Sequence, residues 1–373
     1  MGQQIPIRVR EQEKLGENDW EYVKGLGLSW DTSFDEKKPP YLGLSAKGWS
    51  SYYVGAVWLR PSEGEHGQSE PRPLVVTPKF DDIDFIRLFS KAFDDDIPIN
   101  YFEKSYDIYF EEPPIEENTL NTILSPLIVA HYLSTVKRLL KRGLKKSYII
   151  REENLTNKVR GHILPLPNHQ RNILHGHPER AMSRFQEYSA DYPENKLLKR
   201  ALLASENLLL SIGAGNNSLL RNIRKALSRF EEISSDITLS EIKTVHRDKL
   251  HGEYPVAIKL AKMILRHADL SISTDNTKKQ RVPAFSIDMS RIFEFHVLSL
   301  LKDYLHGETV KFQEDADIMG RCDYIIPSMH LIVDAKYKRD YPTRENDVIR
   351  ADVREVTGYS RSKKNKKDTP GRK

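Results

Sequence analysis

Hydrophobic residues in the first 110 positions occur in short runs typical of β-strands. These runs are rich in aromatic and β-branched residues, are separated by turn formers, and cover residues 20–23, 41–44, 52–59 and 74–77. A helix is predicted over residues 83–93, because Phe85, Phe89 and Phe93 recur at helical spacing. We therefore expect residues 1–110 to form a β-rich domain.

The hydrophobic spacing changes to the 3.6-residue period of helices over residues 111–280. One helix is predicted to begin at Ser125-Pro126, an N-cap followed by proline at the first helical position, and to end at Gly143. Further helices are predicted over about 193–210 and 254–267. The pattern indicates a helical middle region.

Helices and strands mix in residues 281–360. An amphipathic helix is predicted over 288–305 and another over about 346–360, and between them short strands are predicted at 310–312, 321–326 and 331–337. The turn 327–330 joins the last two strands into a hairpin, and its second strand begins with the apolar run 331–333, typical of burial on both faces. The predicted fold is therefore multidomain α+β, ending in an α/β domain over 281–360 and a basic tail over 361–373.

The net charge of +5 comes from this tail. Residues 361–373 hold seven Lys/Arg and one Asp, and the remainder of the chain has 51 basic and 52 acidic residues. Overall charge is thus no argument for nucleic-acid binding, and any such surface must be local. One cysteine, Cys322, excludes an internal disulfide framework and agrees with a reducing, cytoplasmic compartment. No apolar run approaches the roughly 20 residues of a membrane span.

Candidate chemistry lies at the predicted C-terminal hairpin. Asp323 and Asp334 are brought to one end of the sheet by the turn between them, and Asp334 and Lys336 share a strand face. Two carboxylates, with the carbonyl of Ala335 between the functional side chains, suit Mg²⁺, and a lysine beside the ion can stabilise a pentavalent phosphorus. The pattern favours phosphodiester hydrolysis, although Asp334 and Lys336 alone would also fit a surface ion pair.

Further acidic residues are predicted beside this hairpin. Glu294 lies on the apolar stripe of the helix 288–305. A carboxylate there is costly unless it meets a cation or escapes to solvent at the rim. Asp352 and Glu355 share a face of the last helix, which either borders the site or faces solvent.

A basic segment without acidic residues runs from Lys137 to Arg151. Its positive side chains are consistent either with a helix end that complements the helix dipole or with a surface that contacts DNA phosphates. The candidate DNA contacts are Lys137, Arg138, Lys141, Arg142, Lys145 and Lys146.

These residues resemble a known family. The hairpin resembles the PD-(D/E)xK nuclease motif, and the run 331–337 (LIVDAKY) is similar to the signature of the McrC family, the nuclease subunits of McrBC restriction systems. Other segments similar to the family are 53–55 (YVG), 77–79 (TPK), 159–163 (VRGHI), 184–188, Asp191 with 195–199 (NKLLK), and 292–294 (IFE). The resemblance therefore extends through most of the chain.

The resemblance implies a specific function. McrC-like proteins pair with a hexameric AAA+ GTPase, McrB, stimulate its GTP hydrolysis and cut DNA that contains methylcytosine. By this resemblance Asp323, Asp334 and Lys336 would be catalytic with support from Glu294, and Mg²⁺ would be bound by Asp323, Asp334 and Ala335. Residues 1–110 would bind the partner, which alone would bind GTP.

Two departures from the family pattern are present. Glu355 stands where the family often has glutamine, which changes the charge near the metal. The chain also ends soon after the last predicted helix, where the nuclease fold normally adds a strand and a helix. We expect a truncated C-terminus, a divergent variant, or a basic tail that contacts DNA. The alternative function is accordingly a non-cleaving adaptor that assembles and activates the AAA+ partner. A nuclease that acts alone is a weaker third possibility.

Overall fold

The computed structural model describes residues 5–30, 40–61, 70–93, 105–213, 215, 217–238, 252–271, 281–315, 321–338, 352–357 and 359. The chain divides into two compact units. The first unit comprises Met1–His131, Asn217–Leu219 and Arg266–Lys373, and the second comprises Tyr132–Asn216 and Leu220–Leu265. Both contain helices and strands, so the predicted mixed α+β class is confirmed.

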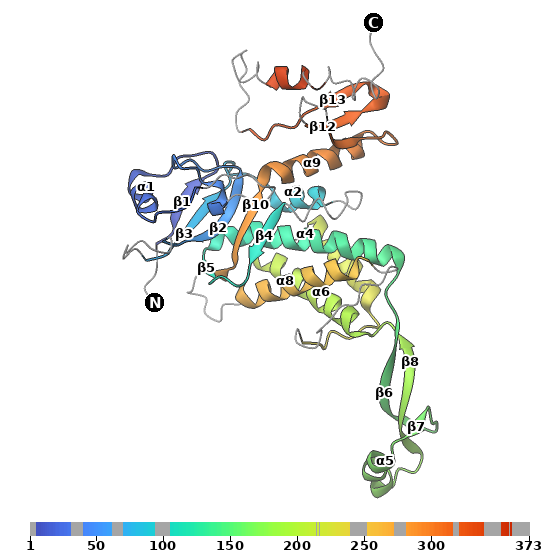
Figure 1. Ribbon diagram of the computed structural model, residues 1–373. Coiled ribbons are helices and arrows are strands. Elements are labelled where there is room, and N and C mark those ends of the chain that lie inside the picture. The colour runs from blue at the N-terminus through green and yellow to red at the C-terminus, as the bar shows by residue number, and fades with distance from the viewer. Residues whose placement is uncertain are drawn as a thin grey trace. The chain divides into compact units, whose positions relative to one another are not determined.

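A five-stranded sheet forms the centre of the first unit (Figure 1). Its order is β1-β3-β2-β10-β4, and only β1 and β3 are parallel. The strands are β1 (Ile7–Arg10), β2 (Tyr53–Leu59), β3 (Arg72–Thr77), β4 (Tyr106–Tyr109) and β10 (Ala284–Asp288). Strands β2 and β3 agree with the sequence pattern. Strand β10 comes from the C-terminal part of the chain, which brings that part into the N-terminal sheet.

Two of the predicted N-terminal strands are wrong. Residues 20–23 lie in helix α1 (Glu17–Lys24), and residues 41–44 overlap the 3₁₀ turn η1 (Pro40–Gly43). Glu17 and Asp19 favour a helix because they lie in its first turn, where negative charge complements the dipole. An apolar run of four residues does not distinguish helix from strand by its period, so packing against the sheet decides it.

Strand β10 leads directly into helix α9 (Met289–Tyr304). The Asp288 side chain caps this helix by accepting a hydrogen bond from the backbone N–H of Arg291 at 3.0 Å. Helix α2 (Phe85–Ala92), which agrees with the predicted helix, packs against α9. The start of α9 is thus fixed by the five-stranded sheet.

A smaller antiparallel sheet of order β11-β12-β13 follows α9. Its strands are β11 (Lys311–Asp315), β12 (Arg321–Ile326) and β13 (Leu331–Val333), and the turn η7 (Pro327–Met329) confirms the predicted hairpin. The prediction that residues 331–333 are buried on both faces is wrong, since Leu331 is 42% exposed. Among the described strands β13 pairs with β12 alone, and the buried central position belongs to β12.

Helix α4 spans Asn118–Arg142 and contains Pro126. The predicted N-cap at Ser125 is therefore wrong. Ser125 is buried inside the helix, where its hydroxyl lies 2.8 Å from Asn121 Oδ1 and 2.9 Å from His267 Nε2. Proline removes one helical hydrogen bond, but buried apolar residues lie on both sides of it, and this tertiary packing outweighs the local cost.

The second unit has a helical core. Helices α6 (Pro193–Ser211) and α8 (Tyr254–Ser271) agree with the sequence pattern, and α7 (Ser218–Leu227) lies between them in the chain. Asn195 is fully buried, donates to the carbonyls of Lys145 and Ala190, and accepts a hydrogen bond from the Tyr254 hydroxyl at 2.6 Å. This amide fixes the beginning of α6 to the segment that follows α4.

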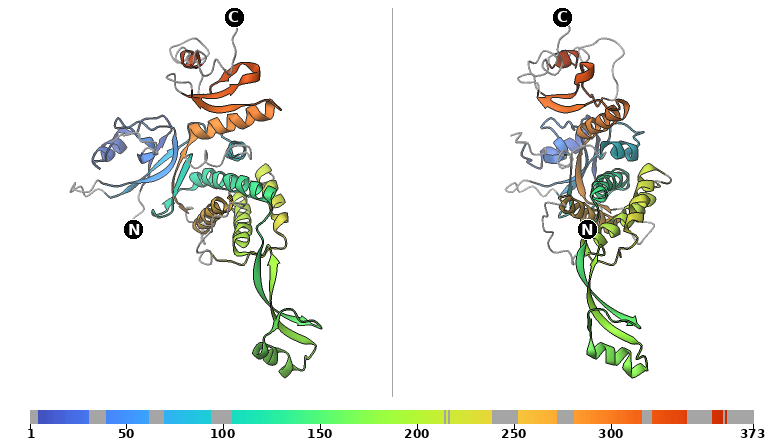
Figure 2. Two further views of the ribbon diagram at one scale, coloured as in Figure 1. Left: turned by 45° about the vertical axis from the view of Figure 1, so that its right-hand side comes forward. Right: turned by 90° about the vertical axis from the view of Figure 1, so that its right-hand side faces the viewer.

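The middle region is not helical throughout, because it contains a long antiparallel hairpin (Figure 2). Strands β6 (Ser147–Thr156) and β8 (Arg180–Ser189) pair along their full length. Its outer end carries β7 (His162–Ile163), α5 (Pro165–Arg171) and the 3₁₀ turn η2 (Ile173–His175). We refer to residues 147–189 as the hairpin arm.

The remaining described segments are short. Strands β5 (Ile115–Glu116) and β9 (Arg281–Val282) pair with each other, and residues 352–357 form a helical turn within the predicted last helix. The beginning of that helix, 346–351, and the basic tail 361–373 lie outside the described residues. None of the described helices is long and apolar enough to cross a membrane.

Candidate active site

The predicted strand 331–337 ends at Val333, so Asp323 lies on β12 while Asp334 directly follows β13, and Asp334 and Lys336 do not share a strand face. Tyr324 of β12 pairs with Val333 of β13, which brings the residues next to them, Asp323 and Asp334, to the same end of the hairpin. The backbone N–H of Ala335 donates to Asp323 Oδ2 at 2.7 Å. This bond holds the chain beyond β13 against β12 and places the Asp334 carboxyl beside that of Asp323.

Burial and neighbouring charge affect the Asp323 carboxyl. Burial raises its pKa to about 6, and the charge of Asp334 adds to the increase, while the Ala335 hydrogen bond and the Lys336 charge oppose it. Two close carboxylates repel each other when both are ionised. A cation between them would relieve this repulsion.

Glu294 is a third carboxylate in the same electrostatic environment. It is half-buried on α9, and its Oε2 accepts a hydrogen bond from Gln313 Nε2 at 2.9 Å. Burial raises the pKa of Glu294 to about 7, with a further contribution from the charge of Asp323. The Tyr324 hydroxyl donates to the Glu294 backbone carbonyl at 2.6 Å, which ties α9 to β12. Glu294 therefore does not escape to solvent at the rim.

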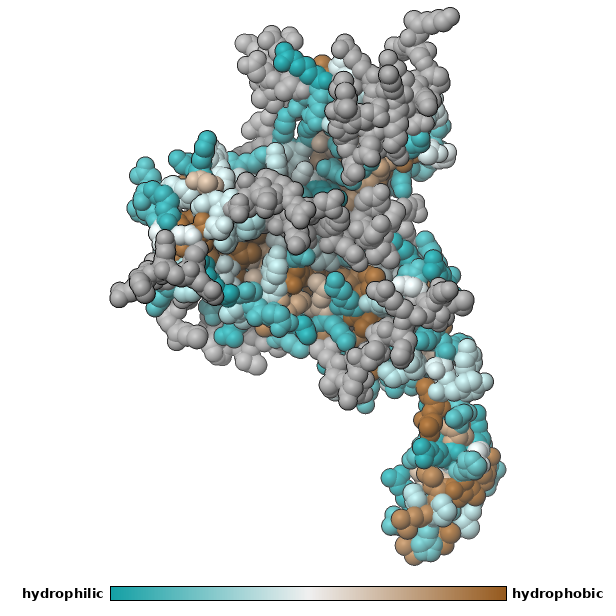
Figure 3. All heavy atoms as spheres, viewed as in Figure 1, coloured by the Kyte–Doolittle hydropathy of each residue, from teal (hydrophilic) through white to brown (hydrophobic). Residues whose placement is uncertain are grey.

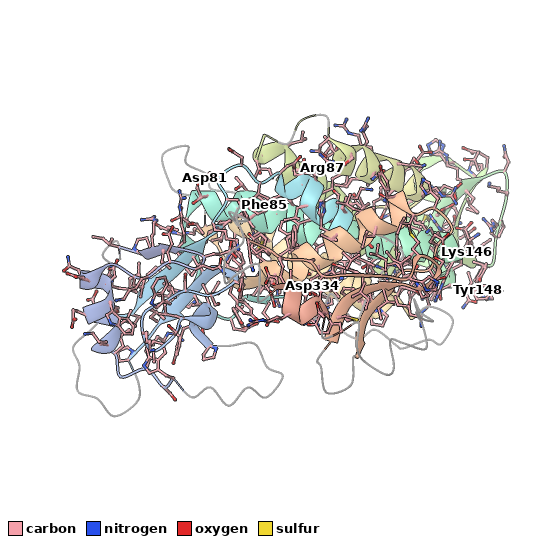
Figure 4. All side chains as sticks on the ribbon, turned by 90° about the horizontal axis from the view of Figure 1, so that it is seen from above. Asp81, Phe85, Arg87, Lys146, Tyr148 and Asp334 are labelled. Carbon is pink, nitrogen blue, oxygen red and sulfur yellow. The ribbon has the colours of Figure 1, made fainter. Side chains whose placement is uncertain are left out.

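Lys336 lies between two carboxylates. Its Nζ is 2.8 Å from Asp334 Oδ2 and 2.7 Å from Glu355 Oε2 (Figure 4 labels Asp334). Burial alone would lower the pKa of Lys336, but its hydrogen bonds to both carboxylates outweigh burial and raise it. The side chain is thus held as a cation, suited to electrostatic stabilisation rather than to accepting a proton.

The two acidic residues of the last helix differ in their partners. Glu355 contacts Lys336 and also accepts a hydrogen bond from the Tyr359 hydroxyl at 2.7 Å. The Lys336 hydrogen bond lowers the pKa of Glu355. Asp352 instead forms an ion pair with Lys338 at 2.6 Å. Glu355 therefore directly contacts Lys336 of the predicted site.

The donors fit a divalent ion only if backbone and water oxygens take part. Within the part of the chain that the structure describes, no three His, Cys, Asp or Glu side chains form a group that could hold a metal. Asp323, Asp334 and the Ala335 carbonyl leave further positions for water, which Mg²⁺ usually retains. Burial and the charge of Asp334 disfavour the ionised form of Asp323, and a bound cation would stabilise that form.

The candidate DNA-contacting residues lie on α4 and the segment after it. Several have partners within the protein: Arg138 donates to Ser134 Oγ, Arg142 pairs with Glu253 at 2.7 Å, and Lys145 lies over the Tyr192 ring. Lys141 and Lys146 are exposed and Lys137 is half-buried, and Lys146 precedes β6 (Figure 4). The internal pairs favour a structural role for part of this segment, and DNA contact stays a prediction.

The structure adds residues that sequence reasoning did not assign to the site. Gln313 holds Glu294, while Glu11 and Lys79 contact Tyr337, directly after the predicted catalytic segment. Lys79 and Tyr337 belong to segments that resemble the family, and that was the available signal. Nothing in the local sequence distinguished Glu11 from a surface glutamate.

The comparisons agree with the predicted family. A model described as "McrBC 5-methylcytosine restriction system component" matches residues 74–369. The chain is also similar to a half-complex from a tetradecameric assembly of Thermococcus gammatolerans McrB AAA+ hexamers with bound McrC, at 15% identity and a TM-score of 0.38, covering 96% of this chain and 85% of that chain. The T. gammatolerans McrBC complex matches at 16% identity and a TM-score of 0.34, covering 83% and 90%. No curated protein gives a match. Because the family model spans most of its length, this chain belongs to the family of McrBC 5-methylcytosine restriction system components.

Proposed function

We propose that this chain is the endonuclease subunit of an McrBC-type restriction system and cuts methylcytosine-containing DNA by metal-dependent phosphodiester hydrolysis. The observation that supports this most is the grouping of Asp323, Asp334 and Lys336 at one end of the small sheet, with Glu294 beside them. Family membership supports the same function.

Each of these residues has a role in the proposed reaction. Asp323, Asp334 and the Ala335 carbonyl would hold Mg²⁺, which when bound neutralises phosphate charge and supplies a hydroxide. Lys336 keeps its proton between Asp334 and Glu355 and would stabilise charge that develops on the phosphate oxygens. Glu294 can exchange a proton near neutral pH, since its pKa is about 7, and Gln313 keeps its carboxyl in place.

We also propose an AAA+ GTPase of the McrB type as the partner, with GTP bound by that partner. Family membership supports a second component, and the McrC of the T. gammatolerans assembly is bound to McrB AAA+ hexamers. The family resemblance implies a partner contact in residues 1–110. The distribution of exposed apolar side chains favours the hairpin arm instead.

Exposed apolar residues are concentrated on the hairpin arm (Figure 3). They include Tyr148, Ile150, Val159, Ile163, Leu166, Ile173, Leu174 and Tyr188, of which Tyr148 is 70% exposed and Leu166 and Leu174 are each 67% exposed. An exposed apolar surface of this kind is typical of a site that binds another protein.

The outer end of the arm is an ordered support for these side chains. Asn172 is fully buried and exchanges two amide hydrogen bonds with Asn154, at 2.8 and 2.9 Å. It also donates to Asn168, whose Oδ1 accepts the N–H of Met182 at 2.9 Å. Because these bonds fix α5 and η2 to β8, the apolar residues that they carry form a preorganised docking surface.

The second candidate function is a non-cleaving adaptor that activates the AAA+ partner. It is favoured by the lack of a three-side-chain metal group among the described residues and by the ion pairs that occupy Lys336. Both functions use the same partner surface. They differ only in whether the site formed by Asp323, Asp334, Lys336 and Glu294 cuts DNA.

One experiment separates the two functions. The wild-type chain and Asp334→Asn would each be mixed with the AAA+ partner, GTP and methylated DNA, with and without Mg²⁺, and GTP hydrolysis and DNA cleavage measured together. We expect Mg²⁺-dependent cleavage that falls by about 10³-fold in the variant, as for the loss of one charge-stabilising group, with GTP hydrolysis unchanged. Stimulated GTP hydrolysis without cleavage by the wild type would select the adaptor, and cleavage without the partner would select a nuclease that acts alone.

A further inference from the structure

The segment that carries Asp334 and Lys336 leaves the sheet before its functional residues. The pairing of β12 with β13 ends at Val333, and residues 334–338 have no regular secondary structure. The hydrogen bond from the Ala335 backbone N–H to Asp323 Oδ2 links this segment to β12. The orientation of Asp334 and Lys336 therefore depends on what fixes the chain immediately afterwards.

Lys79 provides one such contact. This residue follows β3, and only 4% of its surface is exposed. Its Nζ donates to the Tyr337 backbone carbonyl at 2.6 Å and to Gln12 Oε1 at 3.0 Å. The same ammonium lies 3.7 Å from the centroid of the Tyr337 ring, a cation–π distance. One buried side chain from the five-stranded sheet thus holds both the backbone and the ring of Tyr337.

Glu11 provides the second contact. It follows β1 and is 1% exposed. Its Oε2 accepts hydrogen bonds from the Tyr337 hydroxyl and from the backbone N–H of Lys79, both at 3.0 Å. Burial raises the pKa of Glu11 to about 7. A buried carboxyl is costly without such donors, so Glu11, Lys79 and Tyr337 depend on one another.

Aromatic packing completes the pocket around Tyr337. Its ring lies 5.4 Å from that of Phe80, edge on, and 5.5 Å from that of Phe293. Phe293 directly precedes Glu294 on α9. Tyr337 is therefore held by the ends of β1 and β3 and by the helix that carries the third carboxylate.

We propose that Lys79 and Glu11 are positioning residues that hold Tyr337 as an anchor, and that this anchor orients Asp334 and Lys336 for DNA cleavage. The proposal rests on the function proposed above, because it assigns these residues to the same reaction. Neither Lys79 nor Glu11 contacts DNA or metal in it. They act by fixing the chain one residue beyond Lys336.

The principal test compares Lys79→Met with Asp81→Asn in the complete chain with its partner. Asp81 is the matched control, because it lies on the same segment as Lys79, is exposed, and forms an ion pair with Arg10 at 2.8 Å (Figure 4 labels Asp81). We expect Lys79→Met to lower kcat for cleavage by about 10–100-fold, with little change in KM, since a small misplacement of catalytic groups costs up to about 10²-fold. Asp81→Asn should cleave as the wild type does.

Hydrogen–deuterium exchange of residues 331–338 gives a readout independent of cleavage. Faster exchange in Lys79→Met, but not in Asp81→Asn, is the expected result. If the wild type does not cut DNA, the nuclease proposal fails while exchange still tests the anchor. Unchanged exchange and unchanged cleavage in folded Lys79→Met would overturn the positioning role.

Tyr337→Phe is the second variant, in case Lys79→Met does not fold. It removes only the hydroxyl that donates to Glu11 and keeps the ring packed against Phe80 and Phe293. We expect a several-fold loss of kcat, faster exchange of residues 331–338 and near wild-type thermal stability. Wild-type kcat and exchange in Tyr337→Phe would count against the anchor.

Discussion

The candidate site in the first unit and the hairpin arm of the second unit differ in which side chains they shield from solvent. Around Asp323, Glu294 and Lys336 the charged side chains are half-buried and interact electrostatically with one another. On the arm, apolar side chains such as Leu166 and Leu174 are exposed. Buried charge and exposed apolar surface both cost stability, so each region is better explained by function than by folding.

The difference lies in the chemistry that each region presents. Half-buried carboxylates whose pKa values are raised by burial and by neighbouring charge are typical of functional sites, which accords with the proposed chemistry. Exposed apolar residues on an ordered support accord with the proposed protein partner. The comparison therefore separates proposed chemistry in one unit from proposed assembly in the other, and the following predictions test that separation.

Loss of Lys336 should give the largest effect. We expect Lys336→Met to lower DNA cleavage by about 10²–10³-fold, because a cation that stabilises transition-state charge is removed, and to leave partner binding unchanged. Lys338→Met is the matched control, since Lys338 lies two residues further along the same segment and pairs with Asp352 at 2.6 Å, and we expect it to change cleavage only a few-fold. Equal losses in both variants would mean that the charge of the segment matters rather than the position of Lys336.

Two glycine substitutions should separate the regions by stability. A Cβ on Gly55 would lie 2.1 Å from the Phe285 carbonyl oxygen, and one on Gly161 would lie 2.3 Å from that of Arg184, with positive φ at both glycines. Gly55→Ala should reduce the free energy of unfolding by about 3 kcal/mol or more, because β2 and β10 lie in the central sheet. Gly161→Ala should loosen only the outer end of the arm. Thermal unfolding and hydrogen exchange measure the two effects, and equal changes in Tm would contradict a separate arm.

Polar replacements on the arm should weaken assembly. We expect the combined change Leu166→Ser, Ile173→Ser and Leu174→Ser to raise the Kd for the AAA+ partner by about 10–100-fold, since central apolar residues dominate interface energies. Leu203→Ser with Leu210→Ser is the control, because both residues are exposed on α6 in the same unit. Isothermal titration calorimetry gives both Kd values. An unchanged Kd in the arm variant, or an equal loss in the control, would move the partner site elsewhere.

Stability should depend on pH through the first unit. Burial raises the pKa of Glu294 and that of Glu11 each to about 7, above the unfolded value of about 4.3. The charge of Asp323 adds to the increase at Glu294. The folded protein then binds more protons than the unfolded one, so this contribution is complete below about pH 4 and is lost as pH rises toward about 7. In buffer without divalent ions, Tm should fall by a few degrees between about pH 5 and pH 8. Glu294→Gln should flatten this slope, and a Tm that rises over the same range would exclude the assignment.

Sequence patterns predicted some elements better than others for local reasons. Residues 52–59 and 74–77 are strands because their β-branched and apolar residues suit a sheet buried on both faces. The four-residue runs at 20–23 and 41–44 are too short for their hydrophobic spacing to distinguish a helix from a strand. Ser125-Pro126 resembled a helix start, yet the helix continues through it because burial on both sides outweighs one lost hydrogen bond. The arm was missed because its strands do not cover a core: half of the residues of β6 are exposed, and these include apolar Tyr148 and Ile150 beside polar Glu152 and Asn154.

The sequence alone determined the hairpin of β12 and β13, since turn chemistry is local, although the second strand ends at Val333, before Asp334 and Lys336. It also determined the family, because the motifs are contiguous. Only the tertiary structure decided which distant residues meet. It brings Glu294 close enough to Asp323 for the charge of Asp323 to raise its pKa, and it adds β10 to the N-terminal sheet. It also brings Glu11 and Lys79 into contact with Tyr337. These contacts join residues up to 326 positions apart, and no local propensity specifies which distant partners a buried charge will find.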